Sequence, residues 1–141
     1  MERLVFGTRI VMEARGLDGG RFERPVLSEA LEALARLWPL GGSVERLALE
    51  PDASEVHRGS RGYVILHAFP ERGALVIEAF TEGHAPMADF VEAVEGRFDL
   101  TAYALQRTRY GNTLPAGEAA LRQALKGLRF WANARMAAGP D

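Results

Sequence analysis

Residues 62–82 read GYVILHAFPERGALVIEAFTE and carry the clearest structural signal of the chain. Two apolar runs, 62–69 and 74–81, flank the four turn-forming residues PERG. Two such runs joined by a short turn predict an antiparallel β-hairpin. In the first run both alternating sets of residues are largely apolar, so we expect this strand to be covered on one face and partly buried on the other.

Outward from this hairpin, the hydrophobic spacing alternates between two periods. A period of 3.6 residues predicts three helices, over residues 25–38, 86–98 and 115–138. Runs that are β-branched and apolar, or that alternate in polarity, predict strands over residues 3–14, 43–50 and 99–109. Between these elements, segments rich in glycine and proline are expected to be loops, among them residues 51–62.

The resulting order, β-α-β-β-β-α-β-α, predicts an α+β two-layer sandwich. One antiparallel sheet would carry the helices on one face, and its other face would be free to meet a partner. The last helix has an apolar stripe that is expected to cover the chain's own core or a subunit interface. Four basic residues of this helix are expected to lie mostly outside that stripe: Arg122, Lys126, Arg129 and Arg135.

The composition excludes several classes of protein. With 141 residues the chain is one domain's worth of sequence, and its 48% hydrophobic and 26% charged residues exclude disordered, collagen-like and coiled-coil classes. The net charge of -2 argues against a general nucleic-acid-binding protein. No apolar run is long enough for a membrane span. The absence of cysteine excludes disulfides and thiolate metal sites and, with no signal-peptide pattern, is compatible with the cytoplasm, where we expect the protein.

Motifs that carry chemistry are sparse. The three histidines, His57, His67 and His84, have neither helical metal-ligand spacing nor an acidic cluster beside them, so no metal site is expected. The phosphate loop, the dinucleotide fingerprint and the nucleophile elbow are absent. Glu78 and Glu82 share a strand face and are either a carboxylate pair or a solvated strand edge.

His67, Phe69 and Glu71 are spaced i, i+2 and i+4, so they point to one face if the strand continues that far. An aromatic ring can stack a flat heterocycle, and a carboxylate can accept two hydroxyl hydrogen bonds, as from a ribose. The alternative is that His67 is a satisfied core histidine and Glu71 a solvated turn residue.

Residues 67–83, HAFPERGALVIEAFTEG, resemble the stretch His-Thr-Trp-Pro-Glu-x-Gly-x-x-x-Val-Asp-x-Phe-Thr-Cys-Gly of the prokaryotic S-adenosylmethionine decarboxylases. The matching residues are His67, Pro70, Glu71, Gly73, Phe80, Thr81 and Gly83. The opening GTRIVMEARGLD is similar to the family's first strand, through Gly7, Glu13, Gly16 and Asp18. The resemblance covers residues 4–111. It therefore divides the chain into a decarboxylase-like domain, 1–111, and a C-terminal amphipathic helix, 112–141, which belongs to the same domain or to a dimer interface.

Members of this family cleave their own chain at a serine, which becomes the pyruvoyl cofactor of the decarboxylation. Counted back from His67, the serine position is Gly62, and the position of a cysteine implicated in reprotonating the product is Glu82. Glycine has no side-chain oxygen, so the resemblance implies no pyruvoyl group and no catalytic role for Gly62, His67 or Glu82. By the same resemblance Phe69 would stack adenine and Glu71 would bind the ribose hydroxyls, with His67 beside them; alternatively all three survive as scaffold.

The resemblance thus implies an uncleaved pseudoenzyme, homodimeric as in the family. It would bind a nucleoside-type ligand such as S-adenosylmethionine, or pair with an active relative in polyamine (spermidine) metabolism. An active decarboxylase or other lyase that uses Glu82 or Ser60 is the alternative from another class. A structural or interaction protein that only inherited the fold is the third.

Overall fold

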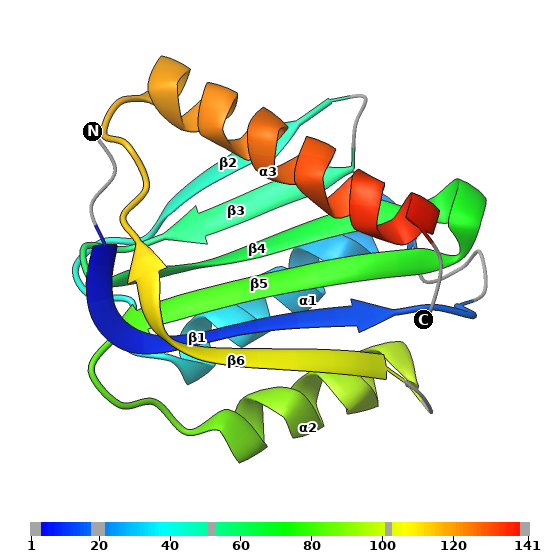
Figure 1. Ribbon diagram of the computed structural model, residues 1–141, viewed down its shortest axis with the longest axis horizontal. Helices are drawn as coiled ribbons and strands as arrows, with labels where there is room; N and C mark the ends of the chain where they lie inside the picture. Colours follow the sequence, from blue (N-terminus) through cyan, green and yellow to red (C-terminus); the bar gives the residue numbers. More distant parts are fainter. Residues whose placement is uncertain (1–3, 18–21, 51–52, 101–102, 139–141) are drawn as a thin grey trace.

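The computed structural model of the protein describes residues 4–17, 22–50, 53–100 and 103–138. Six strands form one antiparallel sheet in the order β2-β3-β4-β5-β1-β6 (Figure 1). The strands are β1 (Leu4–Ala14), β2 (Glu45–Leu49), β3 (Ser54–Arg58), β4 (Gly62–Phe69), β5 (Ala74–Glu82) and β6 (Tyr103–Asn112). The helices are α1 (Arg24–Leu37), α2 (Met87–Phe98), α3 (Glu118–Ala138) and the short 3₁₀ helix η2 (Pro70–Arg72). The predicted α+β class with an antiparallel sheet is confirmed.

The predicted hairpin forms the centre of the sheet. Strands β4 and β5 pair from Gly62 opposite Thr81 to Phe69 opposite Ala74. Their connection is η2, followed by Gly73 in the left-handed conformation with φ 58°. A side chain at that φ would be strained, so the glycine lets the chain reverse direction within four residues.

Strand β3 lies where the sequence predicts a loop. Residues 51–62 were expected to connect two elements, but Ser54–Arg58 pairs with β2 on one side and β4 on the other, and residues 51–52 lie outside the described part. His57 therefore belongs to a strand and is 2% exposed, not in a glycine-rich loop. The segment carries four polar or charged residues in five, so its strand character comes from two neighbouring strands rather than from local composition.

The helices occupy both faces of the sheet, not one face as predicted. Helices α1 and α2 cover one face, and α3 crosses the opposite face over β2 to β4 (Figure 1). On that second face, Val56, Ile65 and Phe80 form an apolar cluster with Leu121 and Leu125 of α3. Because an apolar strand face left in water is unfavourable, α3 covers the face that was expected to meet a partner.

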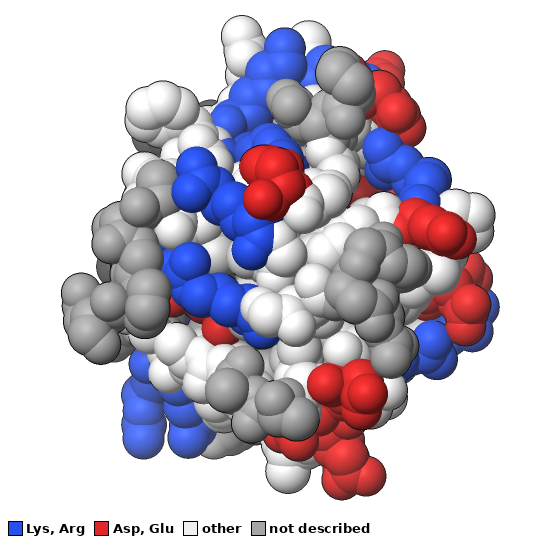
Figure 2. All heavy atoms as spheres, turned by 90° about the vertical axis from the view of Figure 1, so that its right-hand side faces the viewer, with Lys and Arg blue, Asp and Glu red and all other residues white. Residues whose placement is uncertain are grey.

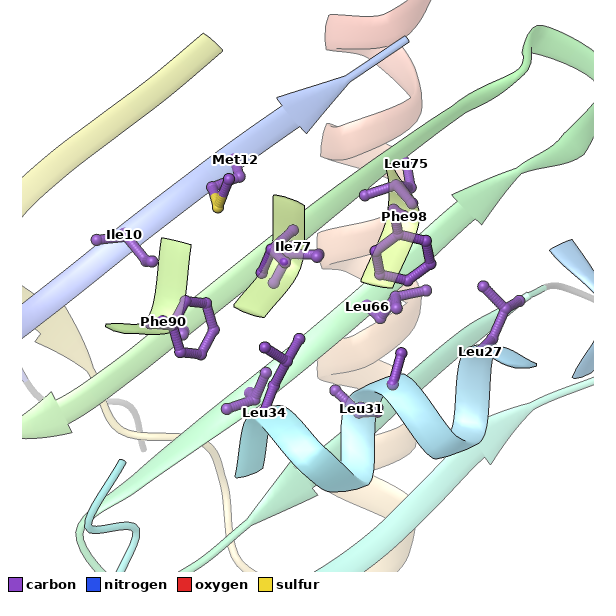
Figure 3. Packing of buried hydrophobic residues seen from close by; sticks show 14 of the residues in the cluster. Ile10, Met12, Leu27, Leu31, Leu34, Leu66, Leu75, Ile77, Phe90 and Phe98 are labelled. Atoms are coloured by element: carbon purple, nitrogen blue, oxygen red, sulfur yellow. The ribbon is translucent and has the colours of Figure 1, made fainter. Parts of the chain in front are cut away.

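The main core lies between the sheet and the pair α1 and α2. Figure 3 shows its side chains pointing from β1, β4 and β5 toward the two helices. The labelled members are Ile10, Met12, Leu27, Leu31, Leu34, Leu66, Leu75, Ile77, Phe90 and Phe98. The spacing of the α1 residues in this set is the one that predicted the helix.

The last strand begins later than predicted. The sequence favours a strand over residues 99–109, whereas β6 runs from Tyr103 to Asn112 and residues 101–102 lie outside the described part. Asp99 ends α2 in the left-handed conformation, and its amide donates to Glu95 O. The helix thus takes the first residue of the expected strand as its cap.

The surface carries separated charge in spite of the small net charge. Figure 2 views the end of the molecule at the right of Figure 1. There Lys and Arg gather at the top and on the left, and Asp and Glu lie mainly along the right and lower margins, with some basic side chains beside them. Among the described residues, no helix combines the length and the apolar character that crossing a membrane requires.

Candidate functional site

A pocket lies beside Gly62, at the start of β4. It has a volume of about 80 Å³, and its lining includes Arg58, Arg61, Tyr63, Phe80 and Glu82. The turn before β4 is anchored because the amides of Ser60 and Arg61 donate to Gly41 O and Leu40 O. Both positions singled out by the sequence resemblance as chemically altered, Gly62 and Glu82, therefore border one pocket.

The backbone of Gly62 is packed against β5. A Cβ atom placed on Gly62 would lie 2.1 Å from Phe80 O and 2.8 Å from Thr81 Cα. Real side chains do not approach backbone atoms that closely, so the strands would have to separate before any other residue fitted. Glycine is required here by the close pairing of β4 and β5.

The pocket carries both signs of charge between aromatic walls. Arg61 Nε lies 3.8 Å from Glu82 Oε2, and both side chains are partly exposed. Arg58 donates to the carbonyl of Pro115 and forms an ion pair with Glu45 at 3.1 Å. The rings of Tyr63 and Phe80 lie 5.9 Å apart at a tilt of 41°. Ser60, two residues before Gly62 in the chain, is exposed, and its amide donates to Gly41 O.

The predicted group His67, Phe69 and Glu71 does not form a shared pocket. The expectation that all three point to one face required the strand to continue as far as Glu71. This condition is not met, because the strand ends at Phe69 and Glu71 lies in η2 with its side chain exposed. His67 and Phe69 do share the face beneath α3 but are 0% and 1% exposed. The turn geometry set by Pro70 and Gly73 separates the carboxylate from the ring.

Phe69 is covered by a residue of α3. The guanidinium of Arg129 lies over the Phe69 ring, with Cζ 4.5 Å from the centroid. Arg129 also donates to Ser54 Oγ at 2.8 Å and to Ala68 O at 2.9 Å. The expectation that Arg129 lies away from the covering stripe of the last helix is therefore wrong, because it lies between the buried residues Leu125 and Ala132.

A buried polar chain crosses the sheet beneath α3. Ser54 Oγ lies 2.8 Å from His67 Nδ1, His67 Nε2 lies 3.2 Å from Glu78 Oε2, and Arg9 donates to Glu78 Oε1 at 3.1 Å. Glu78 is 1% exposed, so it does not belong to a solvated strand edge. Its hydrogen-bond partners are His67 and Arg9, and it does not form a carboxylate pair with Glu82. Sequence reasoning missed this chain since its members come from four strands whose neighbours only the fold defines. The sequence offered one indication of this chain: Glu78 and Phe80 are two residues apart, so their side chains point to the same face of β5.

A second buried histidine lies on the opposite face, under α1. His57 Nε2 is 2.9 Å from Glu55 Oε2, and Ser28 of α1 donates to Glu55 Oε1 at 3.0 Å. Burial alone would raise the pKa of Glu55, but the hydrogen bonds from His57 and Ser28 and the positive charges of His57 and Arg46 outweigh burial and lower that pKa. This group orders β3 against α1. His84 is exposed, and the described part of the chain contains no cluster of three or more His, Asp or Glu that could hold a metal ion.

Comparison with known proteins identifies the fold. No protein-family model matches the chain, and no curated protein matches its sequence. Among solved structures, the chain is similar to the adenosylmethionine decarboxylase from Aquifex aeolicus VF5, with a TM-score of 0.61 and 18% sequence identity. The match covers 81% of this chain and 98% of that one. The fold of this protein is therefore that of an S-adenosylmethionine decarboxylase.

Proposed function

We propose that this chain is an S-adenosylmethionine decarboxylase-like protein that does not process itself and acts by binding rather than by catalysis. Its ligand would be a nucleoside-type molecule such as S-adenosylmethionine, or its role would be to pair with an active relative in polyamine (spermidine) metabolism. The fold is shared with the decarboxylase from Aquifex aeolicus VF5, and the sequence resemblance supplies the residue correspondence.

The observation that carries this proposal is the packing of Gly62. A pyruvoyl group at this position would have to come from a residue with a side-chain hydroxyl. Gly62 has none, and its Cα faces Phe80 O without room for a Cβ. The residues present do not fit the cofactor, and Ser60 is held in the preceding turn by the hydrogen bond that its amide donates to Gly41 O.

The pocket beside Gly62 supports a role in binding. A guanidinium and a carboxylate 3.8 Å apart complement the carboxylate and ammonium of a zwitterionic amino-acid group, which S-adenosylmethionine carries. A pocket of about 80 Å³ has space for a few waters or one such group but not for a purine. The nucleoside part would therefore lie outside this pocket, over its exposed rim.

Intact mass spectrometry tests whether the chain processes itself. We expect a single species near 15.4 kDa. Two fragments that separate between residues 59 and 62, with a keto group on the new N-terminus, would contradict the proposal and favour the active decarboxylase.

Calorimetric titration with S-adenosylmethionine tests the binding role. We expect binding that weakens about tenfold or more in Arg61→Ala, because the ligand carboxylate loses a charged hydrogen bond. Arg36→Ala is the matched control, since Arg36 is an exposed arginine of α1 paired only within that helix to Glu32 in the described contacts. Binding that is lost instead in Phe69→Ala or Glu71→Ala would move the ligand to the residues named by the resemblance, and no binding at all would contradict the ligand role.

A further inference from the structure

Arg129 of α3 contacts the sheet through one aromatic ring and two hydrogen-bond acceptors. The guanidinium Cζ lies 4.5 Å from the centroid of the Phe69 ring, within the range of a cation–π contact. Its two terminal nitrogens donate to a hydroxyl of β3 and a backbone carbonyl of β4, at 2.8 and 2.9 Å. One aromatic face and two acceptors thus enclose a group that has only donors.

Contacts among the strands hold one acceptor of this site, Ser54 Oγ, in position. Arg9 donates to Glu78 Oε1 at 3.1 Å, and Glu78 Oε2 lies 3.2 Å from His67 Nε2. His67 Nδ1 lies 2.8 Å from Ser54 Oγ, and the Ser54 oxygen also accepts from Arg129. Contacts within the sheet therefore hold Ser54 in position, and toward α3 its oxygen acts as an acceptor, because a guanidinium can only donate.

Packing alone does not explain an arginine at this position of α3. Leu125 and Ala132, which flank Arg129 on the covering stripe, are 1% and 0% exposed. The strand residues around Phe69 are apolar too, with Val11, Ala74 and Val76 in the same cluster. Removing part of a guanidinium from water is unfavourable unless its charge and its donors are matched. The ring of Phe69 and the oxygens of Ser54 and Ala68 are among the groups that match it here.

The geometry points to a binding site for a planar, delocalised cation of the guanidinium class on this sheet face, formed by Phe69, Ser54 and Ala68 O and occupied by Arg129. Helix α3 is then the built-in occupant, and a small molecule or a partner side chain with a free guanidinium group competes with it. This site is separate from the pocket beside Gly62, which is lined by other residues, and the inference does not depend on the function proposed for that pocket.

The first test removes the occupant and adds its head group. The variant is full-length Arg129→Ala, and the probe is methylguanidinium at concentrations far below those that denature proteins. The melting temperature of the variant should rise to a plateau, by about 4 °C when the probe is at ten times its dissociation constant. The same concentrations should leave the wild type unchanged or lower its melting temperature. Urea, which is planar but neutral, and sodium chloride at equal ionic strength should not reproduce the rise.

Arg122→Ala is the matched control on the same helix. Arg122 donates to Ala48 O at 3.3 Å and pairs with Glu118. Among the described residues, no aromatic ring forms a cation–π contact with Arg122. An equal response of Arg122→Ala and Arg129→Ala to methylguanidinium would overturn the site. So would a rise that persists when Phe69→Leu is added to Arg129→Ala.

A second measurement covers the case in which Arg129→Ala fails to fold. Hydrogen exchange of wild-type amides in residues 118–138 should accelerate with methylguanidinium and not with methylammonium, because only the planar cation competes with Arg129. Acceleration that is equal for both cations, or no acceleration of α3 relative to β4 and β5, would overturn the proposal that α3 and an external guanidinium share the site.

Discussion

The two faces of the sheet are built differently. Toward α1 and α2, the central strands present an uninterrupted apolar cluster (Figure 3), and the polar pair Glu55 and His57 lies at its margin on β3. Toward α3, two smaller apolar clusters lie on either side of the buried chain Ser54, His67 and Glu78. The first face is held by packing alone over most of its area, whereas the second also has a polar centre.

This difference indicates what each helix layer contributes. Apolar packing is tolerant of small shifts, while hydrogen-bonded buried groups require one arrangement. The α3 face therefore determines where its helix sits through directional contacts to Arg129, and the α1 and α2 face supplies most of the hydrophobic stabilisation.

The largest effect is expected from a deletion on the apolar face. Leu34 is 0% exposed and packs between α1 and the sheet, so Leu34→Ala should lower the free energy of unfolding by about 2–5 kcal/mol. Urea denaturation measures this loss. Leu37→Ala, three residues on and 38% exposed, is the control and should change stability by less than about 0.5 kcal/mol. Equal effects of the two substitutions would mean that the face does not carry the core.

The next effect concerns the polar centre of the other face. Glu78→Gln keeps the size of the side chain but removes the charge that Arg9 and His67 share, and we expect a loss of about 2–3 kcal/mol in the same denaturation experiment. Glu82→Gln on the same strand is the control, since its carboxylate is partly exposed and its partner Arg61 is exposed. A loss under about 0.5 kcal/mol for Glu78→Gln would show that the centre is not a specific network.

The smallest effect is expected at the margin of the apolar face, and it depends on pH. The pKa of Glu55 is lowered in the folded protein, so the native state binds the Glu55 proton less tightly than the unfolded state does. The stability from this carboxylate is complete above the ordinary value of 4.5 and is lost as the pH falls through the lowered pKa. Glu55→Gln should therefore be less stable at pH 7, by at most about 1 kcal/mol because its arginine partners are partly exposed, and should approach the wild type in acid. Denaturation midpoints at a series of pH values measure this, and a gap that widens in acid would contradict the assigned shift.

Much of the fold follows from local pattern. The hairpin and the amphipathic helices were predictable because their residues carry their own periodicity and turn signals. Strand β3 was not, since Glu55, His57 and Arg58 read as a polar loop until β2 and β4 supply hydrogen-bond partners on both sides.

The candidate site was predictable only in part. Resemblance directed attention to Gly62 and Glu82, and the structure brings both to one pocket. Residue spacing placed Phe69 and Glu71 on one face only if the strand continued, and η2 ends the strand between them. Arg129 could not be predicted as a partner of Phe69, because helical spacing defines a face without saying what lies opposite.

By itself, the sequence determined the class of fold and the absence of a side-chain hydroxyl at position 62, because periodicity and residue identity are local properties. The tertiary structure alone decided that a serine would have no room at that position, that α3 covers the second face, and that a guanidinium rests on Phe69. These last features depend on contacts between residues far apart in the chain: β4 with β5 at Gly62 and Phe80, and α3 with β4 at Arg129 and Phe69. Such distances are set by the packing of the whole sheet and its helices, which no single segment encodes.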